Sequence, residues 1–294
     1  MPGRAERLKD WIAALRTGLQ EAGFIEGTNY SLAMRFANGE FDRLPSLAKK
    51  LGALQPRVIV AAGNAVRAVR ALPEIPLVFT GVAVDPVATG LVQSYTRPGG
   101  MITGNVMNAM GSEEAITQKR IGLFKELVPG LTLLGMIGPK DLLSIAELTA
   151  LQKVSGHFGF EVTNYVIQTG DDLEGAFASG RRDGVSAFYI SGEPLLFSNI
   201  SRVMSLVAAS GTPTVGTFPE WGRAGLLMSY SSDIQDGFRH AGTYAAKILG
   251  GTKPGDLPIE QASKFTFVIN LKTAKALGIA VPPTLLSLAD EVIE

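Results

Sequence analysis

The stretch Arg57-Val58-Ile59-Val60-Ala61-Ala62-Gly63 decides the fold. Its apolar run, Val58 to Ala62, begins with three β-branched residues, which is typical of a strand buried on both faces of a parallel sheet. Pro56 stands just before the run and closes a helical pattern over 41–54. Beyond Gly63 a helical pattern is predicted for 64–72. The stretch is therefore the strand of a strand–helix unit.

Outward from this unit the same alternation continues along the chain. The remaining predicted strands are 30–36, 75–79, 102–106, 131–137, 161–168, 185–191, 213–217, 226–231 and 265–270. The remaining predicted helices are 7–21, 113–127, 142–158, 171–180, 195–209, 234–249 and 271–277. Strands alternating with helices predict parallel sheets covered on both faces, and 294 residues suit two domains. We therefore expect an α/β protein of two doubly wound parallel-sheet lobes, with 250–258 as the best linker.

The amino-acid composition argues against several classes of partner and chemistry. The 27 basic and 27 acidic residues balance, and no block of like charges occurs, so neither a nucleic acid nor a membrane surface is expected as a partner. There are no cysteines, which excludes disulfides and thiolate chemistry. Apolar runs are far shorter than a membrane span, and the N-terminus lacks the pattern of an export signal.

The usual motifs of catalysis are missing from the sequence. His157 and His240 have no metal-ligand partner at helical spacing, and no nucleophile elbow, Walker loop or dinucleotide-binding glycine motif occurs. The carboxylate pairs Asp171/Asp172 and Glu113/Glu114 stand at helix starts, where the helix dipole explains them. We expect no catalytic residue, no metal site and no cofactor.

Loops at the carboxyl ends of strands are the places where open α/β sheets bind ligands. In the first half, Asn64 and Ala65 follow the deciding strand, and their backbone N–H groups are candidates to receive a ligand carboxylate. Simple helix capping by Asn64 is an equal alternative. After the next strand come Thr80, Gly81 and Asp85, which bring a hydroxyl, a flexible backbone and a carboxylate. Asp85 alone has a second interpretation, since it precedes Pro86 as a helix start.

Two loops of the second half mirror these. Ser191, Gly192 and Glu193 follow the strand that ends in Phe188-Tyr189-Ile190. The segment Phe218-Pro219-Glu220-Trp221 places two aromatic residues and an acid after another strand. Phe218 and Trp221 are interpreted as a wall on which a ligand stacks, with packing between the lobes as the alternative.

Characteristic motifs occur in the segments 18–27, 41–45, 75–79, 85–87, 97–100, 102–104, 225–230 and 267–278. Together they carry a resemblance along nearly the whole chain to one family, the ABC-transporter substrate-binding proteins of the tryptophan/tyrosine type, which have the type I periplasmic-binding fold. It continues into Val281-Pro282-Pro283 and 289–293. These motifs are specific to the family and not to one ligand.

The resemblance implies two lobes joined by three crossover segments, with a ligand in the cleft between them and delivery to an ABC permease. The N-terminal lobe would comprise 1–108 and 232–258, and the C-terminal lobe 109–231 and 259–294. It adds Gly138, Ser229 and Tyr230 to the ligand-binding candidates. It also implies a periplasmic location, with the export signal removed or truncated.

Two departures from the family pattern stand out. Relatives begin with an export signal and an apolar first strand, whereas this sequence starts at the following helix. At Gly63-Asn64-Ala65, relatives often have Gly followed by Ser/Thr-Pro, which leaves the ligand open.

The expected function is solute binding by hinge closure over a small carboxylate-bearing ligand, an amino acid or an aromatic acid. One alternative is the ligand-sensing module of a regulator or receptor with the same fold. A repressor-type sensor is disfavoured because no helix-turn-helix precedes the lobes. The other alternative is an α/β enzyme, which lacks the required set of catalytic residues.

Overall fold

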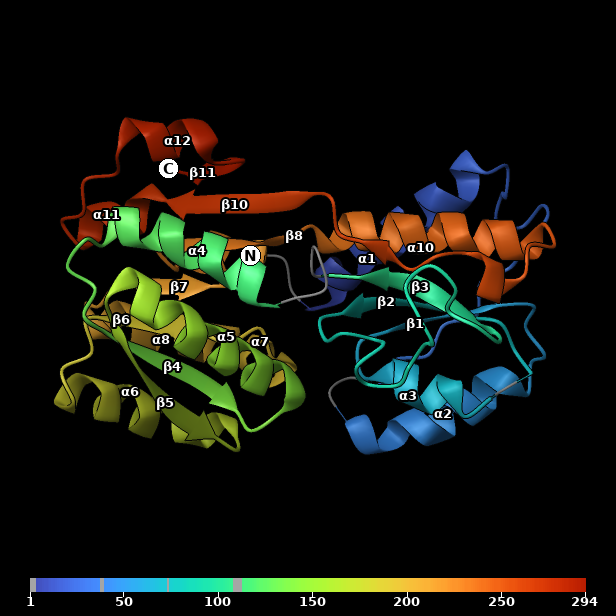
Figure 1. The fold of residues 1–294 in the computed structure, drawn as a ribbon, viewed down its shortest axis with the longest axis horizontal. Helices are drawn as coiled ribbons and strands as arrows, with labels where there is room; N and C mark the ends of the chain where they lie inside the picture. Colours follow the sequence, from blue (N-terminus) through green and yellow to red (C-terminus); the bar gives the residue numbers. More distant parts are fainter. Residues whose placement is uncertain (1–3, 38–39, 73, 108–112) are drawn as a thin grey trace. The chain divides into compact units, whose positions relative to one another are not determined.

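The chain divides into two compact units that three passages of the chain connect (Figure 1). A computed structural model describes residues 4–37, 40–72, 74–107 and 113–294. The first unit comprises Met1–Gly111 and Asp233–Lys264, and the second Ser112–Ser232 and Phe265–Glu294. The last passage lies after Lys264 and not at the expected 258/259, because Glu260–Gln261 pairs with the first unit's sheet. The boundary expected at 108/109 falls outside the described residues.

The first unit is built on a four-stranded parallel sheet whose order is β1-β2-β3-β9. The strands are β1 (Ile59–Ala62), β2 (Leu77–Val82), β3 (Ile102–Val106) and β9 (Glu260–Gln261). Successive side chains of β2 enter different cores: Val78 faces one, while Leu77 and Phe79 face the other. This period of two explains why the strands read as uninterrupted apolar runs.

Helices cover both faces of this sheet. The helices α2 (Leu44–Gly52) and α3 (Ala65–Arg70) pack on one face, and α1 (Arg4–Glu21) with α10 (Ile234–Leu249) pack on the other. The helices α1 and α10 cross in backbone contact, since a Cβ on Gly18 would lie 1.9 Å from the Arg239 carbonyl oxygen. A Cβ on Gly242 would lie 2.1 Å from the Leu15 carbonyl oxygen. The two glycines therefore allow the crossing.

The strand predicted for 30–36 was wrong. Tyr30 forms a single bridge with Glu26, and 31–37 has no regular secondary structure. A strand needs a neighbour for its backbone hydrogen bonds, and within the described residues β1 stands at the sheet edge, paired with β2. Alternating apolar residues were therefore not sufficient to make a strand here.

The second unit contains a seven-stranded sheet in the order β11-β10-β8-β7-β6-β4-β5. Its strands are β4 (Leu133–Pro139), β5 (Glu161–Ile167), β6 (Ala187–Ile190), β7 (Thr214–Gly216), β8 (Met228–Ser232), β10 (Phe265–Asn270) and β11 (Glu291–Ile293). All neighbours are parallel except β8 and β10. The chain leaves the unit at the end of β8 and returns at the start of β10, so these two strands run in opposite directions.

Two cores flank this sheet, as expected for a doubly wound domain. On one face lie α4 (Glu113–Leu127), α5 (Leu142–Phe158), α11 (Leu271–Ala276) and α12 (Pro283–Leu288). On the other lie α6 (Leu173–Arg182), α7 (Pro194–Ser198), α8 (Ile200–Ser210) and α9 (Pro219–Ala224). In β6, Tyr189 faces the first core, while Phe188 and Ile190 face the second. Among the described helices of both units, none is long and apolar enough to cross a membrane.

Candidate functional site

The register of the second sheet places several predicted residues along one edge. Ile137 of β4 is level with Ile190 of β6, Ile190 with Gly216 of β7, and Gly216 with Ser229 of β8. The residues that come next along the chain are Gly138, Ser191, Thr217 and Tyr230 respectively. Ser191 and Thr217 directly follow the ends of β6 and β7. Because the carboxyl ends of parallel strands meet at one edge of a sheet, these four residues form a row there. Three of the four were predicted from the sequence.

Ser191 of this row belongs to a set of hydrogen-bonded polar groups, which we call the Glu147 network: Arg120, Ser144, Glu147, Tyr189, Ser191 and Gly192. The Glu147 carboxylate accepts hydrogen bonds from the Ser191 hydroxyl, from Gly192 N at 3.1 Å and from the Tyr189 hydroxyl at 3.3 Å. Ser191 Oγ also lies 2.8 Å from Ser144 Oγ. The network therefore fixes the backbone and side chain of the predicted Ser191-Gly192 loop.

Arg120 connects this network to β8. Its Nη1 donates to the Tyr189 hydroxyl at 2.8 Å and lies 3.4 Å from Glu113 Oε1, and its Nε donates to the Tyr230 carbonyl oxygen at 2.7 Å. Arg120 is almost fully buried at 1% exposure. A buried guanidinium needs such partners to offset its lost hydration.

Burial also governs the ionisation of this region. It raises the pKa of Glu147 to about 7, with the charge of Glu113 as the second cause. The hydrogen bond from Ser191 and the charge of Arg120 act in the opposite direction but are smaller. The pKa of Tyr189 is raised well above its usual range, again chiefly by burial. Burial therefore favours the protonated form of Glu147.

Glu193, the next predicted residue, is 3% exposed, and its Oε1 has no hydrogen-bond partner within the described chain. It precedes α7, yet its side chain makes no capping hydrogen bond. Burial, followed by contact with Asp141, raises the pKa of Glu193 to about 8. Leaving a buried polar atom unpaired costs about 1–3 kcal/mol. The Glu193 carboxyl does interact with the Asp141 side chain and the Ser144 backbone, so only its Oε1 is left unpaired.

The segment 218–221 differs from its prediction, because it is not a loop. Pro219 starts α9, and Trp221 is fully buried in the second unit's core, where it stacks on Phe197 at a centroid distance of 4.5 Å. Trp221 thus fills the core of its own unit instead of forming an open wall. Phe218 lies closer to the edge, since a Cβ on Gly192 would lie 2.8 Å from its ring. Glu220 is half-buried in the first turn of α9.

The last two candidates of the second unit lie on β8. Ser229 is fully buried beside Gly222, and its hydroxyl has no hydrogen-bond partner among the described residues. Tyr230 stacks on Phe265 with ring centroids 5.8 Å apart. Ser229 is therefore directed toward α9, while the Tyr230 ring is held by its neighbour on β10.

In the first unit, the predicted loops after β1 and β2 lie side by side. Gly63 N donates to the Thr80 carbonyl oxygen at 3.1 Å, and Gly63 and Gly81 both have positive φ, of 53° and 64°. The buried Thr80 hydroxyl donates to Asn105 Oδ1 at 2.9 Å. Asn64 precedes α3, but its side chain makes no capping hydrogen bond, so the capping alternative for Asn64 was wrong. Ala65 is the first residue of that six-residue helix.

Asp85 has a local role in the structure. Its Oδ1 accepts hydrogen bonds from Val87 N at 2.8 Å and Ala88 N at 3.2 Å, which stabilises the turn after Pro86. Asp85 therefore has the local structural role that was the second interpretation of this residue. The segment that it stabilises is a turn, whereas a helix start was expected.

Asp141, Ser144, Glu147 and Thr217 were not predicted as functional residues. The first three recur every third residue at the start of α5, directly after β4, and so share one face of the helix. That spacing was the available signal: a carboxyl, a hydroxyl and a carboxyl on one face of a helix that follows a buried strand.

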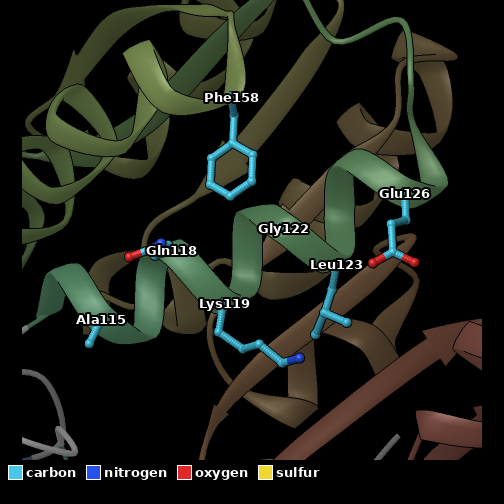
Figure 2. A pocket seen from close by; sticks show the side chains of 7 residues that line it. All are labelled: Ala115, Gln118, Lys119, Gly122, Leu123, Glu126 and Phe158. Atoms are coloured by element: carbon cyan, nitrogen blue, oxygen red, sulfur yellow. The ribbon is translucent and has the colours of Figure 1, made fainter.

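A separate surface pocket lies on α4, away from every predicted residue. Figure 2 shows it between α4 and Phe158 of α5, and its lining residues are Ala115, Gln118, Lys119, Gly122, Leu123, Glu126 and Phe158. Within the ranges that the structure describes, no group of three or more histidine, aspartate or glutamate side chains is placed to hold a metal ion.

Comparison with known proteins identifies the family of this chain. The family model described as ABC transporter substrate binding protein matches residues 6–293. A tyrosine-binding protein of Clostridioides difficile (strain R20291) is 26% identical over 266 residues, which is 89% of this chain and 74% of that protein.

Solved structures of similar fold agree with the predicted fold. A conserved domain protein of Vibrio cholerae has a TM-score of 0.86 at 24% identity, covering 97% of this chain and 95% of that one. An ABC domain of Streptococcus pneumoniae in complex with L-Trp has a TM-score of 0.87 at 22% identity, with the same coverage. A solute-binding protein of Rhodopseudomonas palustris in complex with 3,4-dihydroxybenzoic acid has a TM-score of 0.58 at 14% identity, covering 87% and 80%. These likenesses confirm the predicted type I periplasmic-binding fold.

Proposed function

The chain belongs to the ABC transporter substrate-binding protein family, and from this premise we propose that it binds an amino acid or a small aromatic acid. The observation that carries the proposal is the row Gly138, Ser191, Thr217 and Tyr230 at one sheet edge, together with the buried, unpaired Glu193 Oε1 beside it. Rigidly held polar groups with unused hydrogen-bonding capacity are what a specific small-molecule site requires.

The relatives support this range of ligands. One relative is a tyrosine-binding protein, and the structural neighbours include complexes with L-Trp and with 3,4-dihydroxybenzoic acid. These ligands share a carboxylate and a flat apolar body. In the first unit, the loops at Asn64–Ala65 and Thr80–Gly81 are the proposed partners of the carboxylate, because their backbones adjoin at the carboxyl ends of β1 and β2.

We further propose that the ligand is held between the two units and that binding brings them together. A ligand shifts such an equilibrium only through contacts that it makes in the closed form. Groups on both units are therefore expected to contribute to affinity. The chain would act without chemical change of its ligand, outside the cytoplasmic membrane, and deliver the ligand to an ABC permease.

A thermal-shift screen of amino acids and aromatic carboxylates, followed by calorimetry and small-angle scattering on the best ligand, tests the binding role. We expect saturable 1:1 binding with a Kd of micromolar or below, a smaller radius of gyration at saturation, and recovery of the ligand unchanged. Failure of a broad library to bind would contradict the proposal, and conversion of the ligand would revive the enzyme alternative.

The transport role has its own test. Cells that lack this chain should lose uptake of the radiolabelled ligand, and expression of the chain should restore it. Uptake that is independent of the chain would contradict delivery to a permease.

A further inference from the structure

The strand β5 forms a long open edge of the second unit's sheet. It stands at one end of the strand order and pairs, among the described strands, with β4 alone. At seven residues it is the longest edge strand that the structure describes, since β11 has three residues, β1 four and β9 two. Glu161, Asn164 and Val166 of this strand are exposed. The edge is therefore accessible to a further strand.

Alternate residues of β5 direct their backbone groups away from β4. Glu161 N donates to the Thr132 carbonyl oxygen at 2.8 Å, so Glu161 faces β4. In a parallel pair of strands, the N–H and C=O groups of one residue point to one neighbour, and those of the next residue point to the opposite side. The backbone groups of Val162, Asn164 and Val166 therefore point outward, where they need a partner or water.

This edge lacks the features that usually keep edge strands from pairing. Residues 162–167 include no charged residue, no proline and no glycine, and their pairing with β4 runs without a bulge. Proteins usually protect a free edge with lysine, proline, a bulge or a very short strand. An uncharged run of high β-propensity is an aggregation hazard when it stays open. A defined partner strand would remove this hazard.

Exposed apolar side chains lie beside the same edge. In the described part of the second unit, three of the four exposed large apolar side chains are Leu142, Ile145 and Val166. Leu142 and Ile145 stand in the first turns of α5, and Val166 is level with Gly138 of β4. Val162, which shares a face of β5 with Val166, packs against the core on the α5 side of the sheet. A partner at this edge would therefore bury apolar surface as well as backbone groups.

We propose that β5 pairs in antiparallel orientation with β5 of a second copy of this chain, so that the two sheets join across a two-fold axis at Asn164. In this register Asn164 is opposite Asn164 of the second copy, and Val162 is opposite Val166 of the second copy. These are the residues whose backbone groups point outward, so the pairing satisfies them in both copies. The inference goes beyond the proposed binding function and does not depend on it.

Self-complementarity is the reason to assign a second copy as the partner. An antiparallel contact between identical strands repeats each pairing on both sides of the axis, as a two-fold interface requires. The two Asn164 side chains meet at the axis, and an amide both donates and accepts hydrogen bonds. The two Glu161 carboxylates would be about 20 Å apart, because they are offset by six residues along the strands. Charge repulsion over that distance is screened.

Light scattering during size-exclusion chromatography, with protein at about 100 μM, tests the proposal. The wild type should have twice the 31.1 kDa mass of one chain. Asn164→Pro removes an N–H group that points outward, which an edge strand tolerates, and Val166→Lys places a charge at the edge. Each variant should raise the dissociation constant of the dimer at least about tenfold. Val166→Lys serves as the second variant if Asn164→Pro does not fold.

Leu288→Lys is the matched control. Leu288 is 59% exposed at the end of α12, and the strand that follows, β11, forms the opposite edge of the same sheet. This variant should have the wild-type mass. A wild type with the mass of one chain, or an unchanged dimer in a folded Asn164→Pro or Val166→Lys variant, would overturn the proposed pairing.

Engineered cysteines test the register, since the chain has none of its own. In Asn164→Cys the two introduced residues are directly opposite, with Cα atoms about 5.5 Å apart, which a disulfide can span. In Val166→Cys the two are offset by four residues, about 13 Å, which it cannot span. Mild oxidation should therefore give covalent dimers of Asn164→Cys and not of Val166→Cys. Equal yields from the two variants, or a higher yield from Val166→Cys, would contradict the register.

Discussion

At the scale of single residues, Glu147 couples the stability of the second unit to pH. Its pKa is raised from 4.5 to about 7, so between these values the folded chain holds more protons than the unfolded chain. Stability is therefore greatest below about pH 4.5 for this group and is lost as pH rises through about 7. The loss attributable to Glu147 is on the order of 3 kcal/mol.

Glu147→Gln should remove this dependence. Urea unfolding between pH 5 and pH 7.5 should show a smaller decrease in the free energy of unfolding than in the wild type. Absolute stability should also fall, because one amide oxygen cannot serve all three donors. Glu161→Gln should retain the wild-type slope, and a wild-type slope in Glu147→Gln would contradict the assignment.

The residues around Glu147 show which parts of the candidate site could be predicted from the sequence. Ser191, Gly192 and Glu193 could be predicted because they directly follow a recognisable strand. Glu147 and Arg120 could not, because their partners are distant in sequence: Ser191 lies 44 residues from Glu147, and Tyr230 lies 110 residues from Arg120.

At the scale of elements, the long helices could be predicted, and so could the edge strands β1 and β5 and the six-residue helices α3 and α11. The strand at 30–36 was wrong, and α9, α12, β9 and β11 were not predicted. The helices α5 and α10 agree with the predicted 142–158 and 234–249 at both ends. Both begin at an aspartate whose side chain caps the helix, Asp141 and Asp233, and such caps are local signals. The segment 30–36 failed because strand formation depends on a partner, and 218–221 failed because it was interpreted as a loop after a strand, whereas Pro219 starts a helix there.

The backbone contact between α1 and α10 gives a prediction at this scale. Gly242→Ala places a Cβ about 2 Å from the Leu15 carbonyl oxygen, so the helices must separate. We expect a loss of about 2–4 kcal/mol of stability, comparable with other overpacked cores. Chemical unfolding measures it.

Gly156→Ala is the matched control, since Gly156 lies inside α5, is exposed, and would bring its Cβ within 4 Å of no other atom. This variant should gain about 0.5–1 kcal/mol from the better helix propensity of alanine. Equal effects of the two substitutions would contradict the described crossing.

At the scale of the whole molecule, two units with alternating strands and helices could be anticipated from the deciding strand and its repeats. The resemblance implied three passages, at 108/109, 231/232 and 258/259. The units divide at 232/233 and 264/265, and the expected 108/109 lies outside the described residues. The central claim for the molecule is that the carboxyl-end loops of both sheets contact the ligand.

Hydrogen–deuterium exchange with and without the best ligand of the screen tests this claim most directly. We predict slower exchange at 138–145 and 190–197 in the second unit and at 63–66 and 80–88 in the first. Protection confined to 115–126, beside the pocket on α4, would contradict the claim.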